Sequence, residues 1–171
     1  MASPVVTIGG IVAICVLVVL SAFFSSSESA IFTLPEAWLE TQDAADGRVA
    51  VLQGLREDPH RLLVTILVGN NVVNMAIASI TTALLVGALP AGSAVTAATV
   101  LASVIVLVFG EIVPKSYGLG HARTWALVVA RPLSLVERLL YPLVAVFDWL
   151  TGGISAALGG DTDIEDPYVE D

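Results

Sequence analysis

The sequence is poor in basic residues and cysteine, and each shortage excludes a class of protein. Seven of its 171 residues are Lys or Arg against sixteen Asp or Glu, and the basic residues form no cluster. This acidic balance argues against binding nucleic acid and against anchoring to anionic lipid. The single cysteine, Cys15, cannot form a disulfide within the chain, and we expect it to be a small buried apolar residue.

Long apolar runs dominate what is present. Hydrophobic residues make up 56% of the chain and its mean hydropathy is +0.88, well above an ordinary soluble domain. Crossing a bilayer takes roughly 20 apolar residues in a helix. We predict an all-α membrane protein with three transmembrane helices, at about 4–34, 62–89 and 94–117. The first run has no Lys or Arg before it and exceeds the ~7–15 apolar residues of a signal peptide, so we expect it to be retained.

The distribution of basic residues predicts the orientation of the spans. All seven Lys and Arg avoid the loop 87–96. They lie in the connector 35–61, at the end of the third span (Lys115) or after it. The positive-inside rule then puts the N-terminus outside the cell membrane and the C-terminus in the cytosol. We expect two short helices in the connector, broken near Asp46–Gly47 and stopped at Asp58–Pro59.

The segment 119–150 is predicted to be a belt-like amphipathic helix on the cytosolic side. Its longest uncharged run, 139–147, is too short to span. Its basic residues share one helical face, and its aromatic residues are expected to anchor it at the interface: Arg123, Arg131 and Arg138; Trp125, Tyr141 and Trp149. We expect kinks at Pro132 and Pro142, and a re-entrant or fourth helix within 139–160 remains the alternative. Residues 1–150 then form the membrane domain, and 151–171 an acidic linker.

Each predicted span carries polar residues where lipid would favour apolar ones. Ser21, Ser25 and Ser29 recur every four residues and so share one face of the first span. Small residues often line helix interfaces, which is the simplest interpretation of serines alone. The second span contains GNNVVN, with Asn70 and Asn74 again four residues apart, and such amides need partners that lipid cannot supply.

The third span contains GEIVPK, and Glu111 is a carboxylate inside a membrane helix, which indicates a functional site. Pro114 cannot donate to the carbonyl of Gly110, so we expect a half-unwound helix with a free backbone oxygen there. Counted at 1.5 Å per residue, Ser25, Asn70 and Glu111 lie about 15, 13 and 10 Å from the cytosolic end. These oxygen groups suit hard cations such as Mg²⁺, whereas zinc or copper would favour His or Cys.

Three motifs together resemble the transmembrane domain of the CNNM/CorC family: SxxxSxxES, ILVGNNVVN and GEIVPKSYG. The resemblance extends from Val5 to Asp148. It implies a homodimer in membrane lipid that transports Mg²⁺, with export coupled to Na⁺ entry, and no catalytic residues. It also implies metal-site positions at Ser21, Ser25, Asn70, Asn74 and Glu111, with Ser29 a further candidate and Gly69 and Gly110 as close-approach or backbone-oxygen positions. Family members continue into ATP-binding CBS modules, which these 171 residues do not contain.

Other functions are open from the sequence. An intramembrane serine protease needs a His or Lys beside its serine, but His60 and His121 lie outside the predicted spans. A non-transporting scaffold, a Mg²⁺ sensor, or a transporter of Mn²⁺ or Co²⁺ would use similar residues. The role of Glu28, near the serine stripe, also remains open.

Overall fold

The computed structural model describes residues 3–43 and 45–158, and these contain helices and no strand. Its elements are α1 (Pro4–Phe32), α2 (Glu36–Glu40), α3 (Gly47–Arg56), α4 (Pro59–Val86), α5 (Ala91–Ile105), the π-helical segment η1 (Val106–Ile112), α6 (Val113–Gly120) and α7 (Ala122–Leu158). Three stretches are long and apolar enough to cross a membrane: Pro4–Phe32, Pro59–Val86 and Gly92–Gly120. The all-α membrane fold predicted from the sequence is confirmed.

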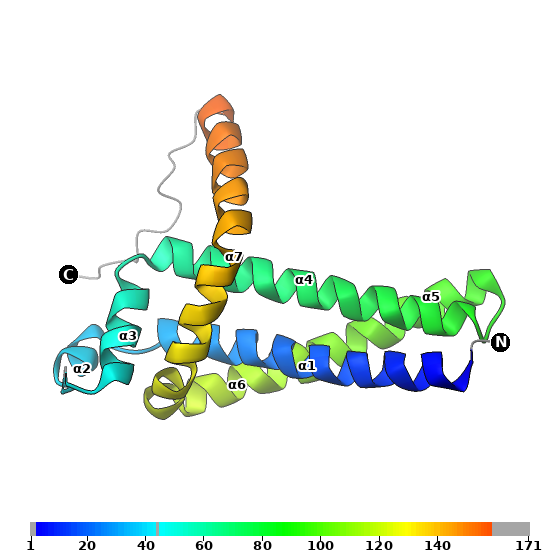
Figure 1. The fold of residues 1–171 in the computed structure, drawn as a ribbon, viewed down its shortest axis with the longest axis horizontal. Helices are drawn as coiled ribbons and strands as arrows, with labels where there is room; N and C mark the ends of the chain where they lie inside the picture. The colour runs from blue at the N-terminus through cyan, green and yellow to red at the C-terminus, as the bar shows by residue number, and fades with distance from the viewer. Residues whose placement is uncertain (1–2, 44, 159–171) are drawn as a thin grey trace.

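The three spans lie side by side along the length of the molecule (Figure 1). The N-terminus and the α4–α5 turn are at one end, whereas α2 and α3 are at the other. We call this second end, which carries residues 33–58, the connector end. The third span consists of α5, η1 and α6 in succession, and α7 crosses over α1 and α4.

Local sequence signals explain where the helices begin and end. The Ser3 hydroxyl accepts from the amide of Val6 and caps α1, and Asp58 caps α4 through the amide of Arg61 at 3.0 Å. Proline occupies the first position of both helices, where no donor is needed. Capping by Asp58 starts α4 three residues before the predicted 62. Pro35 restricts the preceding residue, and α1 ends at Phe32 rather than at 34.

The connector forms two short helices, as predicted. Asp46 begins the second one, because its carboxylate accepts the amide of Arg48 at 2.8 Å. The Arg48 side chain also hydrogen-bonds this carboxylate and holds the pKa of Asp46 below its usual value.

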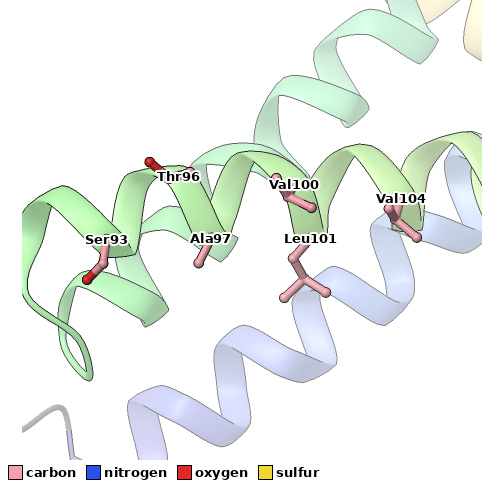
Figure 2. A pocket seen from close by; sticks show the side chains of 6 residues that line it. All are labelled: Ser93, Thr96, Ala97, Val100, Leu101 and Val104. Atoms are coloured by element: carbon pink, nitrogen blue, oxygen red, sulfur yellow. The ribbon is translucent and has the colours of Figure 1, made fainter.

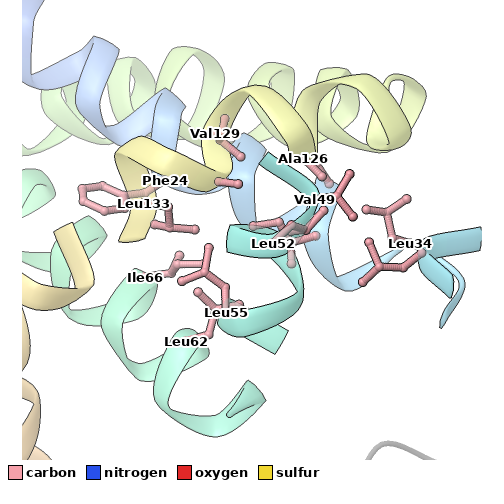
Figure 3. Packing of buried hydrophobic residues seen from close by; sticks show 14 of the residues in the cluster. Phe24, Leu34, Val49, Leu52, Leu55, Leu62, Ile66, Ala126, Val129 and Leu133 are labelled. Carbon is pink, nitrogen blue, oxygen red and sulfur yellow. The ribbon is translucent and has the colours of Figure 1, made fainter. Parts of the chain in front are cut away.

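A hydrophobic core lies at the connector end (Figure 3). Helix α3 inserts Leu52 and Leu55, and α4 contributes Leu62 and Ile66. Helix α7 contributes Ala126, Val129, Ala130 and Leu133, the i, i+3, i+4, i+7 stripe of an amphipathic helix. This packing fixes α7 across the ends of the spans.

Helix α7 differs from the predicted belt helix in its bounds. It starts at Ala122 and continues past the predicted end at 150 to Leu158, and residues 159–171 lie outside the described residues. Pro132 and Pro142 lie inside this helix, on exposed positions, and the kinks expected at them stay a prediction. Trp125 Nε1 donates to the Ser26 hydroxyl at 3.0 Å, which attaches this side chain to α1, and its role as an interface anchor stays a prediction. Tyr141 lies under the Arg61 guanidinium, 4.8 Å from its ring centre, and the side chain of Trp149 is outside the described residues.

The outward faces of the spans are apolar and exposed. Cys15 lies on such a face with Val12, Val16 and Val19, so the expectation that Cys15 is buried was wrong. The reason is that lipid, as apolar as these side chains, covers them as well as protein does. A groove of about 700 Å³ also lies on α5, lined by Ser93, Thr96, Ala97, Val100, Leu101 and Val104 (Figure 2).

One glycine sets how closely the first and third spans approach. A Cβ added at Gly118 on α6 would overlap the backbone carbonyl of Ser26 on α1, which cannot move without displacing its helix. At Gly120, two residues on, a Cβ would meet nothing within 4 Å.

We predict that Gly118→Ala lowers the free energy of unfolding by roughly 1–3 kcal/mol, the usual cost of overpacking. Thermal unfolding in detergent micelles measures this. The matched control Gly120→Ala should be neutral or slightly stabilising, since alanine favours a helix. Equal effects of the two substitutions would contradict the close approach.

Candidate functional site

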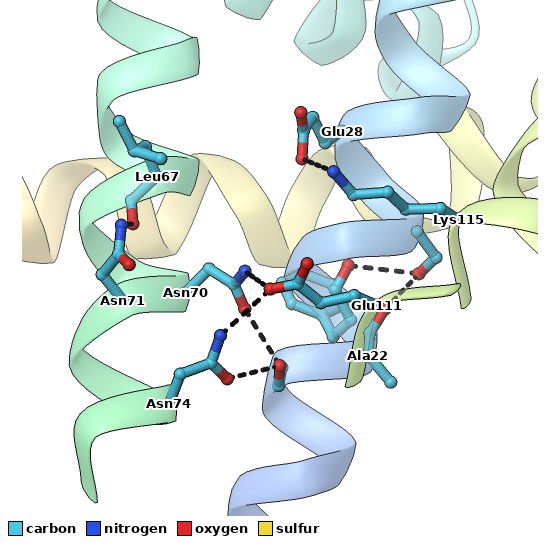
Figure 4. A network of polar contacts seen from close by, with 11 residues as sticks. Ala22, Glu28, Leu67, Asn70, Asn71, Asn74, Glu111 and Lys115 are labelled. Carbon is cyan, nitrogen blue, oxygen red and sulfur yellow. Dashed lines mark hydrogen bonds and ion pairs between the residues drawn. The ribbon is translucent and has the colours of Figure 1, made fainter. Parts of the chain in front are cut away.

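Polar side chains from all three spans meet in one cluster (Figure 4). The Ser21 hydroxyl of α1 lies 2.7 Å from Asn74 Oδ1 and 3.0 Å from Asn70 Oδ1, both on α4. The Nδ2 atoms of these asparagines lie 3.4 Å (Asn70) and 3.3 Å (Asn74) from Glu111 Oε1. Because a hydroxyl has a single proton, Ser21 donates to one amide at a time. We call Ser21, Asn70, Asn74 and Glu111 the polar cluster.

The local structure of the third span places Glu111. It lies in η1, whose wider turns run from Val106 to Ile112 just before Pro114. The half-unwound helix predicted here was wrong, because the chain stays helical from α5 through η1 to α6. A π-helical segment absorbs the donor that proline lacks while keeping the helix continuous, and such segments are frequent at functional sites. Whether the Gly110 carbonyl serves as a ligand stays a prediction.

Two glycines allow the helices to approach at the cluster. A Cβ on Gly110 would lie 2.6 Å from Ser21 Oγ, so only glycine leaves room for that hydroxyl. A Cβ on Gly69 would lie 2.6 Å from the Phe24 ring, one turn nearer the connector end. Gly110 therefore adjoins the polar cluster, whereas Gly69 packs against an aromatic ring beside it.

Of the three serines that share one face of α1 (Ser21, Ser25 and Ser29), only Ser21 contacts the other residues of the polar cluster. The predicted depths matched Ser25 to Asn70 and Glu111, but the serine that contacts the asparagines is Ser21. Ser25, one turn nearer the connector end, is fully buried and its hydroxyl has no hydrogen-bond partner in the described part of the chain. Ser29 is only partly buried and takes no part in the hydrogen bonds that join the polar cluster.

The sequence did not single out Thr65, Ser26 or Ser27. Thr65 on α4 also has a buried hydroxyl with no hydrogen-bond partner among the described residues. Ser26 and Ser27 donate to carbonyls one turn back in α1, and Ser26 also accepts from Trp125. The spacing of the serines could have separated Ser26 and Ser27 from the others, because residues 21, 25 and 29 share one face of the helix and residues 26 and 27 do not lie on it.

Glu28, whose role was open, has a partner in the structure. Its Oε2 lies 3.2 Å from the Lys115 Nζ of α6. The two side chains form an ion pair beside the polar cluster (Figure 4).

The chemistry of the cluster is that of oxygen ligands with one charge. Among the described residues no group of three or more His, Cys, Asp and Glu lies together as a metal site would require, so any ion at this cluster must use amide, hydroxyl or backbone oxygens beside the one carboxylate. The polar cluster offers one carboxylate, two amides and a hydroxyl. This set is suited to a hard cation that binds and leaves, because one carboxylate neutralises only half of a divalent charge.

These features define a multi-pass membrane domain with a polar cluster between its three spans. Comparison with known proteins narrows the class. The chain matches CNNM, described as the Cyclin M transmembrane N-terminal domain, over residues 12–171. It therefore belongs to the CNNM transmembrane-domain family, as its motifs predicted.

Relatives come from a plant and from bacteria. A chloroplastic DUF21 domain-containing protein of Arabidopsis thaliana is 36% identical over 156 residues, covering 91% of this chain and 24% of the relative. A UPF0053 protein of Haemophilus influenzae is 32% identical over 170 residues, covering 97% and 39%. The UPF0053 inner membrane protein YfjD of Escherichia coli is 32% identical over 147 residues, covering 85% and 34%. The chain thus spans about a quarter to two fifths of the length of these relatives.

We predict that Asn74→Leu lowers the free energy of unfolding by roughly 1–3 kcal/mol, because it leaves Ser21 and Glu111 short of a partner. Asn71→Leu is the matched control. Asn71 is exposed and donates only to the Leu67 carbonyl of its own helix, so its loss should be neutral or stabilising in a micelle. Unfolding in detergent compares the two, and a larger cost at Asn71 would contradict the cluster.

Proposed function

We propose that this chain is the membrane domain of a Mg²⁺ transporter that exports Mg²⁺ in exchange for Na⁺ entry. The observation that carries the proposal is the contact of Asn70 and Asn74 on the second span with the Glu111 carboxylate of the third span, while Ser21 of the first span bonds both amides. A carboxylate inside a membrane span is costly and is retained for function as a rule. Membership of the CNNM family supports the same proposal.

The oxygen atoms of the cluster are the proposed Mg²⁺ ligands. In the structure both amide nitrogens face Glu111 and both amide oxygens face Ser21. Rotating each amide by half a turn exchanges these atoms, so that both oxygens point toward the carboxylate. Mg²⁺ would then meet the Glu111 carboxylate and two amide oxygens, with water completing its octahedral shell. Ser25, Ser29 and the Gly110 carbonyl remain further candidate ligands, and Gly69 a close-approach position.

Alternating access is the proposed mechanism. The π-helical turns of η1 join two straighter helices, so a rearrangement there would move Glu111 relative to α1 and α4. The basic residues at the connector end support an orientation with this end in the cytosol and the N-terminus outside. The exposed apolar faces of the spans suit membrane lipid and a second copy of the chain in a homodimer.

We predict that Glu111→Gln lowers Mg²⁺ flux by roughly ten-fold or more, since losing even the partner of a metal ligand typically costs that much. The measurement is Mg²⁺ flux from proteoliposomes with an imposed Na⁺ gradient. Glu36→Gln, an exposed carboxylate in α2, is the matched control and should transport normally. Flux in Glu111→Gln equal to wild type would overturn the site.

The purified protein separates transport from the rival functions. A scaffold predicts no rise in unfolding temperature with Mg²⁺, whereas a site predicts a rise that Glu111→Gln abolishes, because a ligand bound only to the folded state stabilises it. A Mg²⁺ sensor predicts the rise without flux. A Mn²⁺ or Co²⁺ transporter predicts flux of those ions in preference to Mg²⁺.

A further inference from the structure

The ion pair of Glu28 and Lys115 joins two of the three spans that form the polar cluster. Glu28 follows Ser21 by seven residues on α1, and Lys115 follows Glu111 by four residues in the third span. At 1.5 Å per residue these offsets put the pair about 6–10 Å from the cluster. The direction is toward the connector end, and Figure 4 shows the pair beside the cluster on that side.

A buried oxygen lies between the pair and the cluster. Ser25 is three residues before Glu28 and four after Ser21, so the three residues lie along one side of α1. Its hydroxyl is fully buried and has no hydrogen-bond partner among the described residues. Glu28 and Glu111 are also the two carboxylates within the three spans. Oxygen groups therefore continue from the partly exposed Glu28 to Glu111 in the interior.

Because both side chains of the pair are partly exposed, another cation can readily replace the Lys115 ammonium at Glu28. The Glu28 side chain is 32% exposed and the Lys115 side chain 41%, whereas Ser21 and Ser25 are fully buried. Ion pairs this exposed contribute little, because water screens them and two long side chains lose freedom. A divalent cation carries twice the charge of the Lys115 ammonium at the same carboxylate.

We propose that Glu28 is an outer docking site for the divalent cation on the approach to Glu111 from the connector end, and that Lys115 occupies this carboxylate between ions. The arriving cation displaces the ammonium and then moves past Ser25 to the polar cluster. Lys115 thereby neutralises the Glu28 carboxylate while no ion is bound and lowers the affinity of the outer site. The direction of movement rests on the proposed function of Glu111, but binding at Glu28 does not.

Mn²⁺ binding to the full chain tests the outer site, using the loss of the free-ion signal in electron paramagnetic resonance. All variants carry Glu111→Gln, which removes the charge of the inner site. In this background Lys115→Met should raise Mn²⁺ affinity roughly two- to five-fold, the range that an exposed ion pair supplies. Adding Glu28→Gln to Lys115→Met should abolish this gain. An unchanged affinity in Lys115→Met, or a gain that survives Glu28→Gln, would overturn the proposal, as would no measurable Mn²⁺ binding in any of these variants.

Two controls separate the charge of Lys115 from a general disturbance. Lys115→Arg keeps the cation and should bind Mn²⁺ as its parent does. Arg61→Met removes a cation at the same end that pairs with Glu137 rather than with Glu28, and it should give no gain. A gain as large in Arg61→Met would overturn the specific role of Lys115. Failure of the proposed function appears separately, as equal Mn²⁺ binding by the wild type and Glu111→Gln alone.

Discussion

The constraint on which the structure depends is the carboxylate of Glu111 within a membrane-spanning helix. A charged side chain at the centre of a span costs about 2.5–3.5 kcal/mol even on insertion scales, and lipid offers it no hydrogen bonds. Asn70 and Asn74 supply those donors, and Ser21 in turn orients their amides. Gly110 must be small so that α1 approaches closely enough for this. The contacts of Ser21, Asn70, Asn74 and Gly110 can therefore be explained by the need to satisfy one acidic residue.

The two ends of the protein are stabilised by different means. At the connector end, α3 and α7 bury leucines and valines against α1 and α4 as a soluble domain does. Along the spans, lipid covers the apolar faces, and association depends on close contacts such as Gly118 against Ser26 and on hydrogen bonds. The Trp125–Ser26 hydrogen bond links these two regions, because it ties α7 to the serine-rich end of α1.

Periodicity and hydropathy were enough to predict the fold and most of the polar cluster. The spacing of Asn70 and Asn74 places them on one face of a helix. Glu111 is recognised because inserting a carboxylate into lipid costs free energy. The register between helices could not be predicted in the same way. Counting residues by depth paired Ser25 with Asn70, because the first span was predicted to end two residues late and the second to begin three residues late. Measured from the observed helix ends, Phe32 and Pro59, Ser21 and Asn70 lie at the same depth. Pairs between distant residues, such as Glu28 with Lys115, depend on how helices rotate about their axes, which hydropathy does not report.

The location of a bound ion tests the account most directly. Anomalous scattering from Mn²⁺ soaked into crystals of the protein, or grown with it, places the metal independently of transport. The account predicts a peak within ligand distance, about 2.0–2.6 Å, of a Glu111 carboxylate oxygen and of the Asn70 and Asn74 amide oxygens, with those amides rotated. A crystal with Mn²⁺ bound elsewhere at saturating concentration and no peak beside Glu111 would contradict it.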